Sequence, residues 1–180
     1  MAITTYAALW FLPFVLPICI YVAWSDLRTM KIPNHAVLTL LGVFVIIGLV
    51  AVPLAEYPWR LLNGLVVLAI GFVLNMARAF GAGDAKFCAA AAPFIAPDDA
   101  MFVLIIFTAT LLGTWVTHRV VKYSVLKKLA PDWKSWTTGQ DYPMGFALGG
   151  ALSIYLLLGA TQDNWIPWLA QQQWIQMLLS

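Results

Sequence analysis

The segment TYAALWFLPFVLPICIYVAWSDLRTMKIPN (residues 5–34) contains a long apolar run that ends at a carboxylate. Residues 5–25 carry no charge, and Asp26 is the first charged side chain of the chain. A helix that crosses a membrane needs about 20 mostly apolar residues. The run satisfies this requirement, and no basic residues precede it as they would in a cleaved secretory signal. We therefore expect residues 5–25 to form a retained membrane span.

The composition extends this expectation to the rest of the chain. Of the 180 residues, 62% are hydrophobic and only 10% are charged, whereas soluble domains average about 45–50% apolar and about 25% charged residues. We predict an all-α polytopic membrane protein that forms a single transmembrane domain over residues 1–180. Its six transmembrane helices are expected at residues 5–25, 35–55, 58–79, 85–97, 99–118 and 143–161.

Two of the expected segments are unusual. The fourth, AKFCAAAAPFIAP (residues 85–97), is short and rich in alanine. At about 1.5 Å per residue it is too short to cross a hydrocarbon core about 30 Å thick by itself. Its small side chains allow close helix packing, so we expect longer helices to shield it. The tail at 162–180 is rich in tryptophan and is expected to lie at the membrane interface.

Basic residues are distributed asymmetrically over the expected loops. Nine of the ten lie after the first, third or fifth span, and the exception is Arg60. Loops rich in Lys and Arg remain on the cytoplasmic side. This bias predicts an inner (cytoplasmic) membrane protein with its N-terminus outside, and it places Asp26 and Asp84 at the cytoplasmic face. The basic loop at 119–142 is expected to contact anionic lipid rather than nucleic acid.

The second acid lies in GAGDAK (residues 81–86), also at the edge of an apolar segment. Asp84 could simply cap the fourth helix, and Asp26 could simply end the first helix in water. Alternatively, both carboxylates point into one bundle and share a proton, because two acids in one site do not both ionise easily. One can then take a proton from water while the other donates one to a carbonyl group, which is the chemistry of amide hydrolysis.

Three motifs resemble a known family. GAGDAK is similar to the GxGD motif of intramembrane-type aspartic proteases, and SDLRTMKIPN (residues 25–34) resembles the first-aspartate motif of prepilin peptidases. YPMGFALGGA (residues 142–151) resembles the Pro-x-Gly segment that opens the last helix of that family. The resemblance covers most of residues 5–160. It implies an aspartic endopeptidase that cleaves the basic leader peptide from type IV prepilin-like precursors at the cytoplasmic membrane face.

The resemblance also implies a set of site residues. The catalytic residues would be Asp26 and Asp84. The residues expected to bind substrate or shape the site are Gly81, Gly83, Lys86, Arg28, Pro33, Asn34, Pro143 and Gly145. Lys86 could instead face lipid head groups. No metal and no cofactor is expected, and the expected partners are prepilin or pseudopilin precursors and membrane lipids.

The chain departs from the larger prepilin peptidases in one respect. It contains no Cys-x-x-Cys motif, since its two cysteines are Cys19 and Cys88. The zinc-binding domain linked to N-terminal methylation is thus expected to be absent, as in the small peptidases of tight-adherence (Flp-type) pili, and methyltransferase activity is not expected. An archaeal preflagellin peptidase fits equally well. Two other classes remain open: a transporter or channel, and a structural subunit of a secretion or pilus assembly machine.

Overall fold

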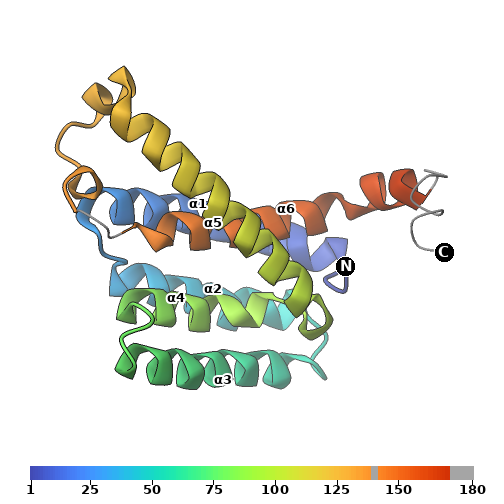
Figure 1. The fold of residues 1–180 in the computed structure, drawn as a ribbon. Helices are drawn as coiled ribbons and strands as arrows, with labels where there is room; N and C mark the ends of the chain where they lie inside the picture. Colours follow the sequence, from blue (N-terminus) through green and yellow to red (C-terminus); the bar gives the residue numbers. More distant parts are fainter. Residues whose placement is uncertain (139–141, 171–180) are drawn as a thin grey trace.

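The structure, a computed structural model, describes residues 1–138 and 142–170. Its six α-helices confirm the predicted all-α class (Figure 1). They are α1 (Thr5–Thr29), α2 (Asn34–Ala51), α3 (Tyr57–Met76), α4 (Ala82–Ala91), α5 (Ala100–Tyr123) and α6 (Met144–Ala170). All except α4 are long and apolar enough to cross a membrane. The chain is therefore a multi-pass membrane protein.

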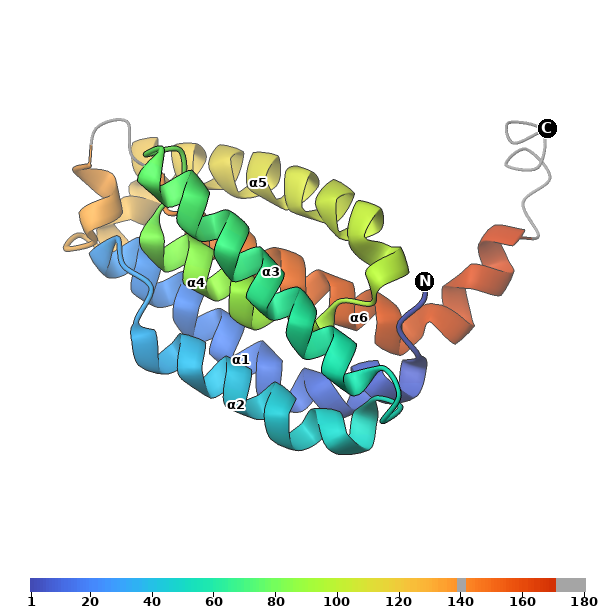
Figure 2. The same ribbon diagram turned by 90° about the horizontal axis from the view of Figure 1, so that it is seen from below.

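The helices form a layered bundle. Helix α1 packs along α6 and also against α2, while α4 lies between α3 and α2 and reaches α6 (Figures 1 and 2). Helix α5 packs on α6 and crosses it obliquely (Figure 1). The short helix α4 is thus covered by longer helices, as expected from its length.

Helix α4 is shorter than the segment predicted at 85–97. It begins at Ala82 and ends at Ala91, and short 3₁₀ turns at Ala92–Phe94 and Pro97–Asp99 continue the chain toward α5. Pro93 and Pro97 lie in these turns, and because proline lacks the N–H group an α-helix requires, it favours a break there. The earlier start places Asp84 inside the first turn of α4.

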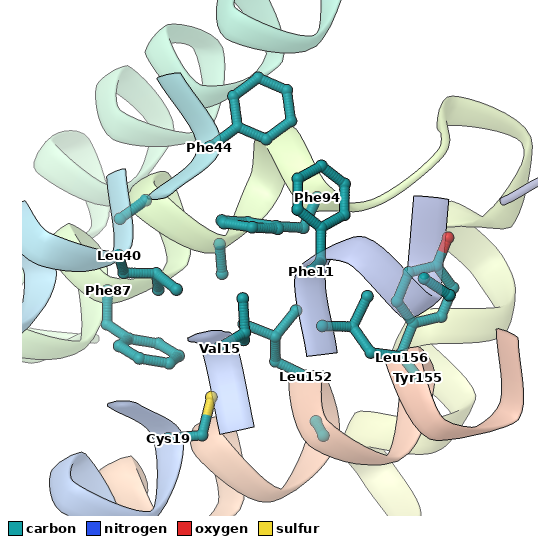
Figure 3. Packing of buried hydrophobic residues seen from close by; sticks show 14 of the residues in the cluster. Phe11, Val15, Cys19, Leu40, Phe44, Phe87, Phe94, Leu152, Tyr155 and Leu156 are labelled. Carbon is teal, nitrogen blue, oxygen red and sulfur yellow. The ribbon is translucent and has the colours of Figure 1, made fainter. Parts of the chain in front are cut away.

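Aromatic side chains from three elements meet at the centre of the core (Figure 3). Phe11 of α1, Phe44 of α2 and Phe94 after α4 lie with ring centroids 4.8–5.7 Å apart, and all three are buried. Val15 and Leu152 continue the core toward α6. Such ring pairs add about 0.5–1.5 kcal/mol each beyond the burial of their area. This cluster fixes α1, α2 and α4 relative to one another.

Two boundaries differ from the prediction in ways that affect the site. Helix α1 continues past the expected end at residue 25 to Thr29, where Met30 ends it in the left-handed conformation (φ 56°). Asp26 therefore lies inside the helix rather than beyond it. Helix α6 continues past residue 161 to Ala170. The rest of the predicted interfacial tail, residues 171–180, lies outside the described residues.

Candidate active site

The two aspartates lie at the same end of the bundle. Asp26 is in the last turn of α1 and Asp84 is in the first turn of α4. Both line one cavity with a volume of about 350 Å³. The two side chains are 58 positions apart in the sequence, and the packing of α1, α4 and α6 brings them together. The two carboxylates therefore face one cavity, as the prediction of a shared site requires.

Asp26 is held by the start of α6. Its side chain is only 5% exposed, and its Oδ2 accepts a hydrogen bond of 2.7 Å from the backbone N–H of Gly145. The N-terminus of a helix carries a partial positive charge, so this position stabilises negative charge on the carboxylate. The interpretation that Asp26 simply ends the first helix in water is wrong.

Gly145 makes this contact possible. A Cβ atom at position 145 would lie 3.0 Å from both the Cβ and the Oδ2 of Asp26. That separation is tighter than side chains normally tolerate, so glycine is the residue that lets the two helices approach. Pro143, which precedes α6, is fully buried beside this junction.

Asp84 does not cap α4. The N-cap is Gly81, in an extended conformation, and no side chain caps the helix. In the space where a Cβ on Gly81 would be, the structure places Oδ2 of Asp84. Among the described residues, the Asp84 carboxylate accepts no hydrogen bond, so it faces the cavity without a fixed donor. The alternative interpretation of Asp84 as a simple helix cap is therefore wrong.

The electrostatics of Asp84 follow from this position. It lies outside the five candidate spans, and burial is the main cause that raises its pKa from 3.8 to about 6, with the negative charge of Asp26 as a second cause. Asp84 thus retains its proton under conditions in which an ordinary aspartate is ionised. The cavity can hold one proton between two carboxyl groups.

The other predicted site residues divide into two groups. Gly81, Gly83, Asn34 and Lys86 line the cavity, and Lys86 Nζ donates a hydrogen bond of 3.2 Å to Asn34 Oδ1. Lys86 is thus exposed, and its side chain is also held by a hydrogen bond to the first residue of α2.

Arg28 and Pro33 are placed differently. The Arg28 guanidinium lies over the Trp24 ring, 5.1 Å from its centroid, and does not line the cavity. Pro33 precedes α2 as its N-cap residue and also lies outside the lining. Both residues belong to the segment at 25–34, but neither lines the cavity that contains Asp26 and Asp84.

Sequence reasoning missed Tyr142. This side chain lines the cavity, and its hydroxyl donates a hydrogen bond to Oγ1 of Thr114 in α5. Burial raises the pKa of Tyr142, and the negative charge of Asp26 raises it further. Tyr142 directly precedes the Pro-x-Gly segment, which was the only signal available. Its contact with α5 depends on the tertiary fold.

Comparison with known proteins agrees with this geometry. A family model described as the type IV leader peptidase family matches residues 13–118. The match spans more than half of the chain and includes Asp26 and Asp84. No curated protein and no solved structure matches the chain. Among the described residues, no group of three or more His, Cys, Asp or Glu side chains is arranged to hold a metal ion.

Proposed function

The chain belongs to the type IV leader peptidase family, aspartic proteases that cleave the leader peptides of prepilins, and we propose that Asp26 and Asp84 are its catalytic pair. One observation carries this assignment: both carboxyl groups line a single cavity, and the two have different environments. Asp26 is buried and Asp84 is partly buried, but among the described residues only Asp26 accepts a hydrogen bond from a backbone N–H, so Asp26 is the more readily ionised of the two, and its charge favours the protonated form of Asp84.

This difference assigns the two roles. The ionised Asp26 takes a proton from a water molecule, whose oxygen forms a bond to the carbonyl carbon of the scissile peptide. Asp84 donates its proton to the carbonyl oxygen, so that a neutral tetrahedral intermediate forms. As the intermediate collapses, the C–N bond breaks and the departing amine takes up the proton held by Asp26, while the proton on the former carbonyl oxygen returns to Asp84. Both carboxyl groups then regain their starting states.

We place this site at the cytoplasmic face. The support is the charge bias of the loops, which assigns the end of the bundle containing Arg28, Lys31 and Lys86 to the inside. A precursor whose hydrophobic helix lies in the membrane would then present the bond between leader and helix beside Asp26 and Asp84. The scissile segment must leave its helix to react, because helical peptide groups are hydrogen-bonded internally.

We further propose that the enzyme is of the small tight-adherence (Flp-type) form, with an archaeal preflagellin peptidase as the alternative. The support is the short connection between the first two helices, residues 30–33, which leaves no room for a domain with paired Cys-x-x-Cys motifs between them. Methyl transfer is accordingly not part of the proposed activity. The distinction is tested by comparing pilin-type and flagellin-type precursors as substrates.

Cleavage by the purified full-length chain tests the proposed function. A prepilin is incubated with the wild-type protein in lipid vesicles, and mass spectrometry identifies the new N-terminus. We expect a single cut between the basic leader and the hydrophobic helix, and no cut with Asp26→Asn or Asp84→Asn. A variant that still trims the precursor at the wild-type rate would remove that aspartate from the catalytic pair.

A further inference from the structure

A second, apolar groove lies between α2, α3 and α4. Its volume is about 580 Å³, and nearly all of its lining is hydrocarbon. Leu38 of α2 and Leu65 of α3 form part of its walls, and 66% and 63% of these side chains are exposed. The groove therefore opens on the membrane-facing surface of the bundle.

Small residues form the floor of this groove. Ala89 and Ala90 of α4 lie there, together with Gly64 of α3. A Cβ on Gly64 would lie only 3.0 Å from the carbonyl oxygen of Ala89 and 3.1 Å from Cγ of Pro93, so α3 and α4 pack backbone to backbone. Because these residues have small side chains and the flanking leucines are large, another helix can approach the backbone of α4 closely here, as small residues allow in membranes.

The groove adjoins the catalytic cavity. Asn34 and Lys86 line both, and the hydrogen bond between them marks the boundary. Lys86 follows Asp84 by two positions on α4. From this boundary the groove runs away from the aspartates along α2 to Val45, a distance of about 16 Å at about 1.5 Å per residue.

We propose that this groove binds the hydrophobic helix of the precursor, with the scissile segment passing over the Lys86–Asn34 hydrogen bond into the catalytic cavity. The inference rests on the proposed function and identifies the surface that presents the substrate to it. The groove begins at the catalytic cavity and extends toward the membrane interior, so its occupant must be an apolar segment joined directly to the cleaved bond. Lipid acyl chains occupy the groove only when no precursor is bound.

The length of the groove sets how much of the helix it holds. A groove about 16 Å long covers roughly half of a hydrocarbon core about 30 Å thick. It therefore receives the first three turns or so after the scissile bond, and lipid surrounds the remainder of the helix. Helix α5 packs on α6 and contributes no residue to the lining of the groove, so it is not expected to contact the substrate helix.

Site-specific photo-crosslinking in membranes tests this surface. A photoreactive amino acid replaces Leu65 or Leu38 in the full-length Asp84→Asn chain, which is co-expressed with a prepilin that the wild-type chain trims. Leu112 of α5 is the matched control, because it is also a leucine and is 64% exposed. We expect crosslinks from positions 65 and 38 to the hydrophobic helix of the precursor, and none from position 112.

Each outcome is decisive. Crosslinks from position 112 and not from 65 and 38 would overturn the inference, and so would crosslinks to lipid alone at the two groove positions. In both cases cleavage by the wild-type chain would leave the proposed function intact. If the wild-type chain trims no prepilin, the proposed function fails, and the substrate groove fails with it.

Discussion

Three aspartates lie at opposite ends of this bundle, and they differ in the number of hydrogen bonds that their carboxylates accept. Asp99, before α5, accepts hydrogen bonds from the backbone N–H groups of Ala2 (2.7 Å) and Ile3 (3.0 Å) and from the Tyr155 hydroxyl (2.8 Å). Asp26 accepts one from Gly145, and Asp84 accepts none among the described residues. The first carboxylate is fully engaged with the protein, whereas the other two face a cavity.

Under the proposed function, this contrast separates a structural acid from the two proposed catalytic acids. A carboxylate with three donors is stabilised in its ionised form and has little capacity left to bind water or exchange a proton. A carboxylate that faces a cavity retains free lone pairs for both. The hydrogen bonds of Asp99 join the first residues of the chain to the start of α5 and to Tyr155 of α6. Asp26 and Asp84 instead line an open cavity of about 350 Å³. The number of hydrogen-bond partners is therefore the basis on which we propose different roles for Asp99 and for the Asp26–Asp84 pair.

The largest expected effect comes from replacing one carboxylate oxygen by an amide nitrogen, at Asp84 in one variant and at Asp99 in another. Asp84→Asn removes the proposed general acid, and we expect cleavage to fall by at least about 10³-fold with no loss of thermal stability, because the Asp84 carboxyl group accepts no hydrogen bond among the described residues that the amide would break. Asp99→Asn places an amide group against N–H and O–H donors and should cost about 2–3 kcal/mol of stability. Prepilin cleavage and thermal unfolding are measured on both variants. Equal losses of stability in the two would erase the contrast.

The neighbours of Asp84 sharpen the comparison at the catalytic end. In Gly81→Ala the new methyl group takes the space of the Asp84 Oδ2, so the carboxyl group must turn away. We expect cleavage to fall about 10²-fold, since a displacement of about 1 Å in a catalytic group has effects of that size. Gly42→Ala on α2 is the control, because no atom lies within 4 Å of its Cβ and it does not line the cavity. An equal or larger loss with Gly42→Ala would contradict the geometry.

The support of Asp26 by α6 is tested in the same way. Gly145→Ala pushes α6 away from Asp26 and weakens the hydrogen bond to its Oδ2, so we expect about a tenfold loss of kcat, the scale of one weakened hydrogen bond to a charged group. Gly150→Ala on the same helix has space for its methyl group, since only Thr110 lies near, at 4.0 Å. The steady-state kinetics of the two variants are compared. Similar kcat values would show that the Gly145 contact does not position the acid.

The smallest effect is expected from pH. The proposed reaction needs Asp84 protonated, and its pKa is raised from 3.8 to about 6 by burial and by the charge of Asp26. Below about pH 6 the proton is present, and above it cleavage should fall by up to about tenfold per pH unit. The profile of kcat/KM against pH measures this. A decline that begins near pH 4, as for an ordinary aspartate, would contradict the proposed protonation.

The sequence was sufficient to predict the helical membrane fold and to place Asp26 and Asp84 at the same end of the bundle. Long apolar runs indicate spans because a membrane imposes a length, and the GxGD motif at Asp84 is short and local. The sequence was not sufficient to predict that α1 continues past Asp26. The residue that ends the helix in the left-handed conformation is Met30, whereas glycine is the residue that usually marks such an end. The sequence also could not predict the Lys86–Asn34 bond or the contact of Tyr142 with Thr114, since both join separate helices that meet only in the folded bundle.

Thiol labelling from the two sides of the membrane tests the central claim most directly. Cys19 and Cys88 are replaced by alanine, and single cysteines are placed at position 26, position 84 or both, in sealed vesicles of known orientation. We predict that both positions react with an impermeant reagent from the cytoplasmic side and that a short bifunctional reagent joins them within one chain. Labelling of the two positions from opposite sides, or no crosslink between them, would contradict a shared catalytic site.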